Sequence, residues 1–168
     1  MHTADLLDDA FGRIGDEVHR VVEGLTTEAL AFRPDAQANS IAWLIWHLTR
    51  VQDDHVATVA GHEQAWTSEG WATRFGLPLM VADIGYGHDS EQVAAVTADA
   101  ALLAGYYDSA SALTTSFVSG LTDDDLDRVV DERWEPPVTL GVRLVSVIAD
   151  ALQHVGQAAY VRGLIERR

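Results

Sequence analysis

The chain has 168 residues, 48% of them hydrophobic and 22% charged, which are ordinary values for a folded globular protein, and we expect one domain over residues 1–168. Asp and Glu number 26 against 11 basic residues, and the formal net charge of -15 argues against binding to nucleic acid or to anionic membranes, because phosphate groups would be repelled. The absence of Cys excludes disulfides, thiolate metal ligands and a cysteine nucleophile.

The first segment is predicted to be an amphipathic helix of roughly 20 residues that begins near Thr3. Its apolar residues recur every three or four positions, and acids lie opposite them. Gly24 ends the helix, and Thr26 or Thr27 can cap a short turn before Pro34. The segment lacks the basic region and apolar run of a signal peptide, and no apolar stretch nears the roughly 18 residues of a membrane span, so a cytoplasmic location is expected.

A second long helix is predicted to begin after Asn39 and Ser40, which can cap it. One side of this helix is apolar: Ile41, Leu44, Ile45, Leu48, Val51 and Val59. His47 lies on the flank of this apolar stripe, Asp54 lies two turns further along, and His55 falls near the centre of the stripe. All three are expected at or near the buried side.

Residues 62–89 form the least regular stretch of the chain. Its glycines and Pro78 argue against a long helix, although three aromatic residues can anchor a short one: Trp66, Trp71 and Phe75. A connection of this length in a compact domain is commonly a lid or a binding loop. Tyr86 and His88 are its candidates for substrate contact.

Two further long helices complete the predicted set. The third is expected over residues 90–120, and the fourth over residues 139–165, after a short turn and an extended segment at residues 134–137. No stretch reads as a convincing strand. Four amphipathic helices without a sheet predict an all-α protein, and a four-helix bundle is the simplest arrangement.

Asp150 and His154 lie in the middle of the fourth helix, and His154 projects from its apolar face. Side chains four residues apart stand on one side of a helix, about a turn apart, where both can bind one metal ion. A cation would compensate the buried carboxylate and imidazole together. A hydrogen bond between the two side chains would also satisfy them, so the spacing leaves both interpretations open.

The second helix offers two histidines as a third metal ligand, because metal sites in bundles are built from inward side chains of facing helices. By helical phase, His55 points more squarely inward than His47, so the spacing does not choose between them. Asp54 is expected to be a solvated acid or a helix-pair partner. A hydrogen bond from Asp54 to a metal ligand is the alternative.

Arg143 and Gln157 share the side of the fourth helix that carries Asp150. Either can bind a cofactor or a substrate, and polar packing is the alternative interpretation for both. The sequence has no Walker-type loop, no dinucleotide fingerprint and no nucleophile elbow. The paired Glu-x-x-His motifs of a di-iron bundle are also missing, so a mononuclear site is the best-supported prediction.

Three motifs, taken in order, give the chain a family resemblance: Leu25-Thr-Thr-Glu-Ala-Leu-Ala-Phe-Arg-Pro34, Asn39-Ser-Ile-Ala-Trp-Leu-Ile-Trp-His47-Leu48 and Asp150-Ala-Leu-Gln-His154-Val-Gly-Gln157. Together they resemble the DinB-like superfamily, and specifically its mycothiol transferase-like branch, over nearly the whole chain. The resemblance implies a four-helix bundle with a long crossover connection. It also implies a divalent metal, zinc or nickel, held by three side chains.

Carried over residue by residue, the resemblance implies His47, Asp150 and His154 as the metal ligands and so selects His47 over His55. Many superfamily members have His where this chain has Asp150, whereas the related mycothiol-dependent isomerases resemble it in using an acid. Two imidazoles and one carboxylate still suit zinc. Homologous bundles often dimerise, so a homodimer is among the expected partners.

The function expected from the resemblance is a metal-dependent thiol S-transferase. A metal-bound thiol is held as the thiolate, and since the chain has no Cys, the sulfur must come from a cosubstrate, which the resemblance implies is mycothiol. The thiolate would attack a small electrophile. The alternatives are a metal-dependent hydrolase that uses metal-bound water and a metal-binding bundle without catalysis.

Overall fold

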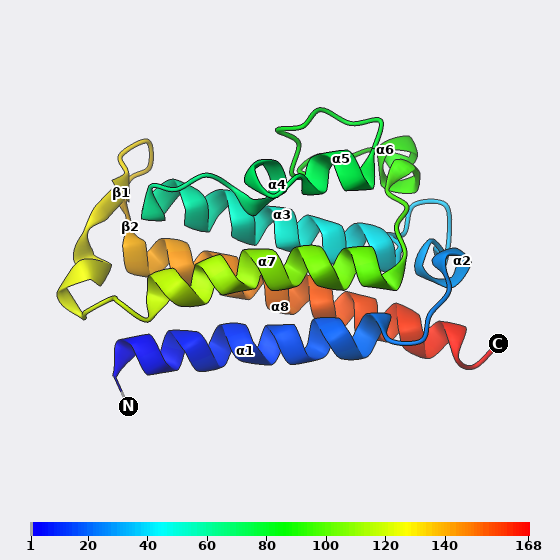
Figure 1. The fold of residues 1–168 in the computed structure, drawn as a ribbon, viewed down its shortest axis with the longest axis horizontal. Coiled ribbons are helices and arrows are strands. Elements are labelled where there is room, and N and C mark those ends of the chain that lie inside the picture. The colour runs from blue at the N-terminus through cyan, green and yellow to red at the C-terminus, as the bar shows by residue number, and fades with distance from the viewer. Residues whose placement is uncertain (1) are drawn as a thin grey trace.

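Four long helices form the body of the structure, a computed structural model that describes residues 2–168 (Figure 1). They are α1 (Thr3–Val22), α3 (Ile41–Ala60), α7 (Ala100–Val118) and α8 (Leu140–Ile165). Helix α3 packs against α7 and α8, and α1 packs against the same two helices, so α1 and α3 lie diagonally across the bundle. The predicted all-α four-helix bundle is therefore confirmed.

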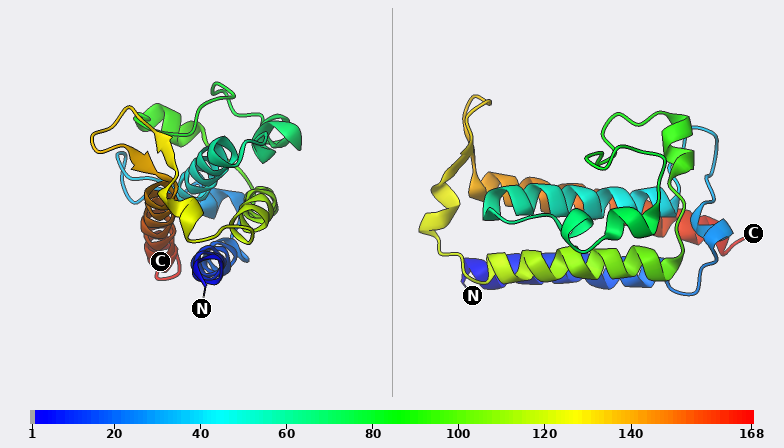
Figure 2. Two further views of the ribbon diagram at one scale, coloured as in Figure 1. Left: turned by 90° about the vertical axis from the view of Figure 1, so that its left-hand side faces the viewer. Right: turned by 45° about the horizontal axis from the view of Figure 1, so that its top comes forward.

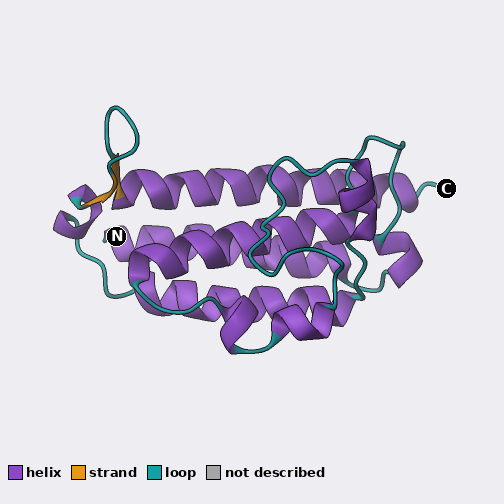
Figure 3. Ribbon diagram, turned by 90° about the horizontal axis from the view of Figure 1, so that it is seen from above, coloured by secondary structure: helices purple, strands orange, loops and turns teal. Residues whose placement is uncertain are grey.

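A long crossover joins α3 to α7. The two helices run in the same direction, so residues 61–99 must return along the bundle (Figure 1). The return contains the short helices α4 (Ala65–Ser68), α5 (Trp71–Phe75) and α6 (Ser90–Ala95). Seen from above, its loops cross over the long helices (Figure 3). This crossover includes the irregular stretch that the sequence predicts at residues 62–89.

Side-chain caps set the start of the two helices that matter most for the site. The hydroxyl of Ser40 accepts a hydrogen bond from the amide of Trp43 at the start of α3, and Thr139 does the same for Val142 at the start of α8. Gly61 adopts a left-handed conformation, with φ of 76°, and ends α3. Both helices therefore begin within a residue or two of their predicted starts, and α8 also ends at its predicted residue.

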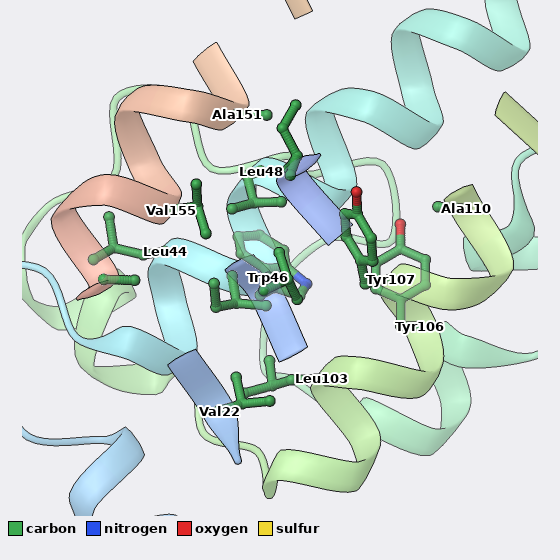
Figure 4. Packing of buried hydrophobic residues seen from close by; sticks show 14 of the residues in the cluster. Val22, Leu44, Trp46, Leu48, Leu103, Tyr106, Tyr107, Ala110, Ala151 and Val155 are labelled. Carbon is green, nitrogen blue, oxygen red and sulfur yellow. The ribbon is translucent and has the colours of Figure 1, made fainter. Parts of the chain in front are cut away.

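The core lies between the four long helices and is filled by side chains from all of them (Figure 4). It includes Val22 of α1, Leu44 of α3, Tyr107 of α7 and Val155 of α8. Helix α3 is buried on nearly every side, because the crossover covers the face that α7 and α8 leave open. Nowhere in residues 2–168 is a helix both long and apolar enough to cross a membrane.

The sequence predicts that the third long helix is one continuous helix over residues 90–120. This prediction is wrong at its N-terminal part, where the structure has two separate helices. Helix α6 ends at Ala95, and Val96 is extended, with ψ of 99°. The side chain of Asp99 then caps α7 by accepting a hydrogen bond from the amide of Leu102 at 2.7 Å. The apolar repeat continues across the break, so periodicity alone could not reveal it.

A short β-ribbon at one end of the bundle also corrects the sequence prediction, which has no strand (Figure 2). The 3-10 helix η1 (Asp124–Asp127) leads into β1 (Val129–Asp131), which pairs antiparallel with β2 (Val138–Thr139). Strands of two and three residues are too short to show a two-residue periodicity. Together with the loop that joins them, these strands form a hairpin beside the C-terminal end of α3.

Candidate metal centre

His47 of α3 meets Asp150 and His154 of α8 where the two helices pack together. One potential ligand atom from each of the three lies within 4.8 Å of the others. The imidazole rings of His47 and His154 have centroids 4.8 Å apart, and His154 Nε2 lies 3.6 Å from Asp150 Oδ1. We call these three residues the His–Asp–His cluster. No other trio of His and acidic residues in the described chain is as close.

The crossover determines how the imidazole of His47 is oriented. The Nδ1 atom hydrogen-bonds to the backbone carbonyl of Ile84, which can only accept, so Nδ1 carries the proton and the lone pair is on Nε2. The indole of Trp43 stacks on the ring, with centroids 4.6 Å apart and planes 16° apart. Burial lowers the pKa of His47, which favours the neutral form that metal binding requires.

The two residues of α8 form a half-site within one helix. Gln157 Oε1 lies 3.2 Å from His154 Nδ1 and accepts a hydrogen bond from it, which leaves Nε2 facing Asp150. Burial by itself would lower the pKa of His154, but the nearby carboxylate of Asp150 outweighs burial and raises it. The half-site thus attracts positive charge, whether a proton or a metal ion.

Asp150 supplies a direct test of whether the cluster fits a cation. Its Oδ2 atom is buried and has no hydrogen-bond partner among the described residues. A buried carboxylate oxygen without a partner is costly, and a cation bound between the three side chains would satisfy it. Two imidazole nitrogens and one carboxylate oxygen are a donor set that suits zinc. The residues present therefore fit a divalent ion.

The cluster is closed on one side and open on the other. His47 is 2% exposed, whereas the side chains of Asp150 and His154 are 22% and 19% exposed. The two partly exposed side chains of the cluster are therefore both on α8. Three protein ligands with one accessible side are typical of reactive metal sites rather than structural ones, which are fully coordinated by protein.

Gly85 allows the crossover to approach His47 this closely. Its φ is +98°, and a Cβ atom there would lie 2.5 Å from His47 Nδ1 and 3.1 Å from a ring carbon of Trp46. The next residue, Tyr86, places its ring edge-on to His47 with centroids 5.3 Å apart. Residues 84–86 thus contact the cluster directly, which the sequence signalled only through the glycines in this loop.

A buried ion pair on α3 anchors the crossover. The side chains of Arg50 and Asp53 are 0% and 1% exposed, with Arg50 Nη1 3.9 Å from Asp53 Oδ2. Arg50 donates to the carbonyl of Asp83 and to Oε1 of Gln64. Asp53 accepts hydrogen bonds from the amides of Ala65 and Trp66 and from the hydroxyl of Tyr106. Sequence reasoning missed this pair, although two charges three residues apart in an apolar helix were a usable signal.

His88 supports the cluster indirectly rather than facing an open site. The indole of Trp43 donates to His88 Nδ1 at 3.0 Å. Since an indole N–H only donates, His88 Nδ1 accepts, and its Nε2 donates to Asp83 Oδ2 at 2.9 Å. Trp43 in turn stacks on His47. Trp43 and His88 therefore help to hold the His47 ring in place, which the sequence did not suggest.

His55 does not join the cluster, which corrects the argument from helical phase. Its side chain is 18% exposed, and its Nδ1 lies 3.1 Å from Asp54 Oδ2. Phase arguments assume a single buried face, but residues 41–53 of α3 are all buried because the crossover covers the outer face. His47 is therefore fully buried although it lies on the flank of the apolar stripe. Asp54 bonds to His55 and Gln64 and contacts no cluster residue.

Arg143 and Gln157 lie on opposite sides of the cluster along α8. Arg143 Nη2 pairs with Asp131 Oδ2 at 3.1 Å, and Gln157 contacts His154. Arg143 also lines an open pocket of about 430 Å³ between α3, α8 and the β-ribbon. We call it the hairpin pocket, and its polar lining includes Asp54, His55, Asp131, Glu132, Arg133 and Arg143. Cofactor binding by Arg143 and Gln157 stays a prediction.

The chain is similar to known proteins over nearly its whole length. The family model described as mycothiol-S-transferase matches residues 6–167. A crystal structure of a conserved protein from Enterococcus faecalis has the same fold, with a TM-score of 0.92 and 31% identity over 100% of this chain and 99% of that one. No curated protein matches. The likeness therefore covers all four long helices and the three residues of the cluster.

Proposed function

Because the chain belongs to the mycothiol-S-transferase family, within the DinB-like superfamily, we propose that it joins mycothiol through its sulfur to a small electrophile with the help of a divalent metal ion. The observation that carries this proposal is the convergence of His47, Asp150 and His154 from two facing helices, with Asp150 Oδ2 buried and unpaired. We propose zinc as the ion, and nickel is the alternative that metal analysis would reveal.

A bound divalent ion would supply one chemical effect, which is to lower the pKa of a coordinated thiol so that it is a thiolate at neutral pH. The protein itself contributes orientation. The Ile84 carbonyl and Gln157 each hold the Nδ1 proton of one histidine, so both Nε2 atoms remain available as ligands. The exposed side of Asp150 and His154 admits the thiol and the electrophile.

In this proposal Tyr86 assists the reaction by hydrogen bonding to the electrophile. Its ring contacts His47, and partial burial raises the pKa of Tyr86, with the negative charge of Asp150 adding to the effect. The phenol therefore stays protonated and can donate a hydrogen bond to negative charge that develops on the electrophile. In the proposed reaction a carbon–sulfur bond forms, the leaving group departs with its electron pair, and the thiol proton passes to solvent.

The decisive experiment measures consumption of an electrophile such as 1-chloro-2,4-dinitrobenzene by the zinc-loaded protein, with and without mycothiol. We expect consumption to require both zinc and the thiol, and to be lost in Asp150→Ala but retained in His55→Ala. A cobalt-substituted sample should also change its absorption spectrum when mycothiol is added. Thiol-independent hydrolysis would instead favour the hydrolase, and metal-dependent stability without turnover would favour a non-catalytic bundle.

Three further expectations belong to this proposal: a single domain over residues 1–168, a cytoplasmic location and a homodimer. Its reaction partners are mycothiol and a small electrophile, and the net charge of -15 argues against nucleic acid. Sedimentation of the purified protein would test the dimer independently of catalysis.

A further inference from the structure

The hairpin pocket lies along the same pair of helices, α3 and α8, as the His–Asp–His cluster, about two helical turns away. Asp54 follows His47 by seven residues on α3, and Arg143 precedes Asp150 by seven residues on α8. Seven residues of α-helix span roughly 10 Å. Since α3 and α8 pack side by side in opposite directions, both steps lead along the contact between the two helices toward the hairpin (Figure 2).

We propose that the hairpin pocket binds an uncharged, hydroxyl-rich ring of the thiol cosubstrate while the sulfur of the same molecule reaches the His–Asp–His cluster. This inference rests on the proposed function. Mycothiol is a cysteine joined through an amino sugar to a cyclitol, so its sulfur and its outermost ring lie at opposite ends of the molecule. A sulfur site and a ring site roughly 10 Å apart along the same two helices match that shape.

The charges in the pocket favour a neutral group over an anion. Three carboxylates line it, from Asp54, Asp131 and Glu132, against the guanidinium groups of Arg133 and Arg143. Both guanidinium groups already pair with Asp131, at 2.8 and 3.1 Å. The carboxylates of the lining therefore outnumber its guanidinium groups, which disfavours an incoming carboxylate or phosphate, and the net charge of the chain further disfavours anions.

The pocket nevertheless contains hydrogen-bond donors and acceptors that are not used by other residues. Arg143 donates to Asp131 through Nη2, and its Nε and Nη1 have no partner within residues 2–168. The carboxylate of Glu132 has no hydrogen bond or ion pair in this same range. A sugar or cyclitol hydroxyl both donates and accepts, so it can bond to a guanidinium and a carboxylate at once.

The pocket also has apolar side chains on which the face of a sugar or cyclitol ring can pack. Val59 of α3 and Val130 of β1 line the pocket beside its polar groups. The faces of a sugar or cyclitol ring carry C–H groups, which lose unfavourable contact with water when they pack on such side chains. The pocket volume of about 430 Å³ falls within the roughly 300–1,000 Å³ typical of small-molecule sites.

The main test compares two thiols on the zinc-loaded protein: mycothiol and N-acetylcysteine, which lacks the sugar and the cyclitol. We expect Glu132→Ala and Arg143→Gln each to raise the KM for mycothiol about tenfold or more, with kcat for mycothiol unchanged. Kinetics with N-acetylcysteine should be the same in both variants as in the unmodified protein. Equal losses with both thiols would overturn the proposal, because they would show a general effect on the site.

Arg143→Gln could also affect folding, because Arg143 pairs with Asp131. Glu132→Ala should not, since Glu132 is an exposed loop residue that makes no ion pair in the described chain. Gln153→Ala is the matched control, because Gln153 is exposed on α8 outside the pocket and bonds to its own helix. We expect this control to leave the KM for mycothiol unchanged. A rise equal to that of Glu132→Ala would contradict the proposal.

A binding experiment separates this inference from the proposed function. The thiol-free disaccharide analogue N-acetylglucosaminyl-inositol, whose nitrogen is an uncharged amide as in mycothiol, should bind to the unmodified protein and to metal-free Asp150→Ala, and ligand-observed NMR should detect it. Binding should be lost in Arg143→Gln. If neither thiol supports transfer but the disaccharide still binds, the proposed function fails and the pocket assignment survives. If benzoate binds and the disaccharide does not, the pocket is an anion site and the inference is wrong.

Discussion

At the scale of single residues, the candidate metal centre depends on atoms that face away from it. The Nδ1 atom of each histidine is occupied, by the Ile84 carbonyl for His47 and by Gln157 for His154. Such contacts select the tautomer and orient the ring, and they are often conserved nearly as well as the ligands themselves. Each of them can be tested by a substitution that leaves the ligands in place.

The ligand assignment predicts which substitutions remove the metal. Protein purified without a histidine tag should lose most of its zinc in His47→Ala, Asp150→Ala and His154→Ala, as measured by mass spectrometry of the metal content. His55→Ala is the matched control on α3 and should keep its zinc, because His55 pairs with Asp54 instead. Full retention of zinc in the first three variants would refute the assignment.

Gly85→Ala should weaken metal binding as well as stability. The left-handed backbone alone costs an L-residue roughly 1–2 kcal/mol, and the added Cβ would press on His47 Nδ1. Gly87→Ala is a matched control, because Gly87 also has a positive φ of +73° but nothing lies within 4 Å of its Cβ position. Urea denaturation and zinc titration of both variants would separate the two effects. Equal zinc affinities would show that Gly85 does not position His47.

Gln157→Leu should lower zinc affinity by about 10- to 100-fold, the usual cost of removing a hydrogen-bond partner from a ligating histidine. The change takes away the acceptor of the His154 Nδ1 proton without touching a ligand. Gln153→Leu, one turn earlier on α8, is the comparison, since Gln153 bonds only to the carbonyl of Ala149. The expectation fails if the two variants bind zinc equally well in a competition with a chelating dye.

At the scale of elements, α3 is the helix on which the site is built, and it is buried on nearly all sides. Sequence patterns identified it as a helix that begins after Ser40, because its N-terminal cap and its apolar residues are local signals. They did not show which of its histidines faces the site, because that depends on the crossover, which returns to α3 from more than 30 positions further along. The sequence did not reveal the helix break before Asp99, because the apolar repeat continues across it. It did not reveal the β-ribbon either, because strands of two and three residues are too short to show a periodicity.

The ion pair that anchors the crossover to α3 gives a prediction for stability. Arg50→Met should lower the free energy of unfolding by about 3–5 kcal/mol, because it leaves the buried carboxylate of Asp53 without its charge partner. The double variant Arg50→Met, Asp53→Asn should recover part of that loss. Urea denaturation gives both values. A loss below about 1 kcal/mol in the single variant would mean that Asp53 is compensated by its other hydrogen bonds alone.

At the scale of the whole molecule, the proposed metal would join two helices that are far apart in the sequence. Any ion held by His47 and by the α8 pair binds the folded state and not the unfolded chain, so it stabilises the fold. Zinc present at 100 times its dissociation constant should add about 2.7 kcal/mol to the free energy of unfolding. Thermal unfolding with zinc and with a chelator would measure the difference, and Asp150→Ala should show none.

Because Gly85 contacts His47, packing of the crossover on α3 and binding of the metal each affect the free energy of the other. If seating of residues 84–86 on α3 favours metal binding, then metal binding must favour that seating by the same free energy. The α8 half-site is local to one helix, whereas His47 is oriented only when the crossover is in place. Occupancy of the centre would therefore protect residues 62–89 from proteases, and a single cut in that loop would release the metal from a bundle that is otherwise still folded.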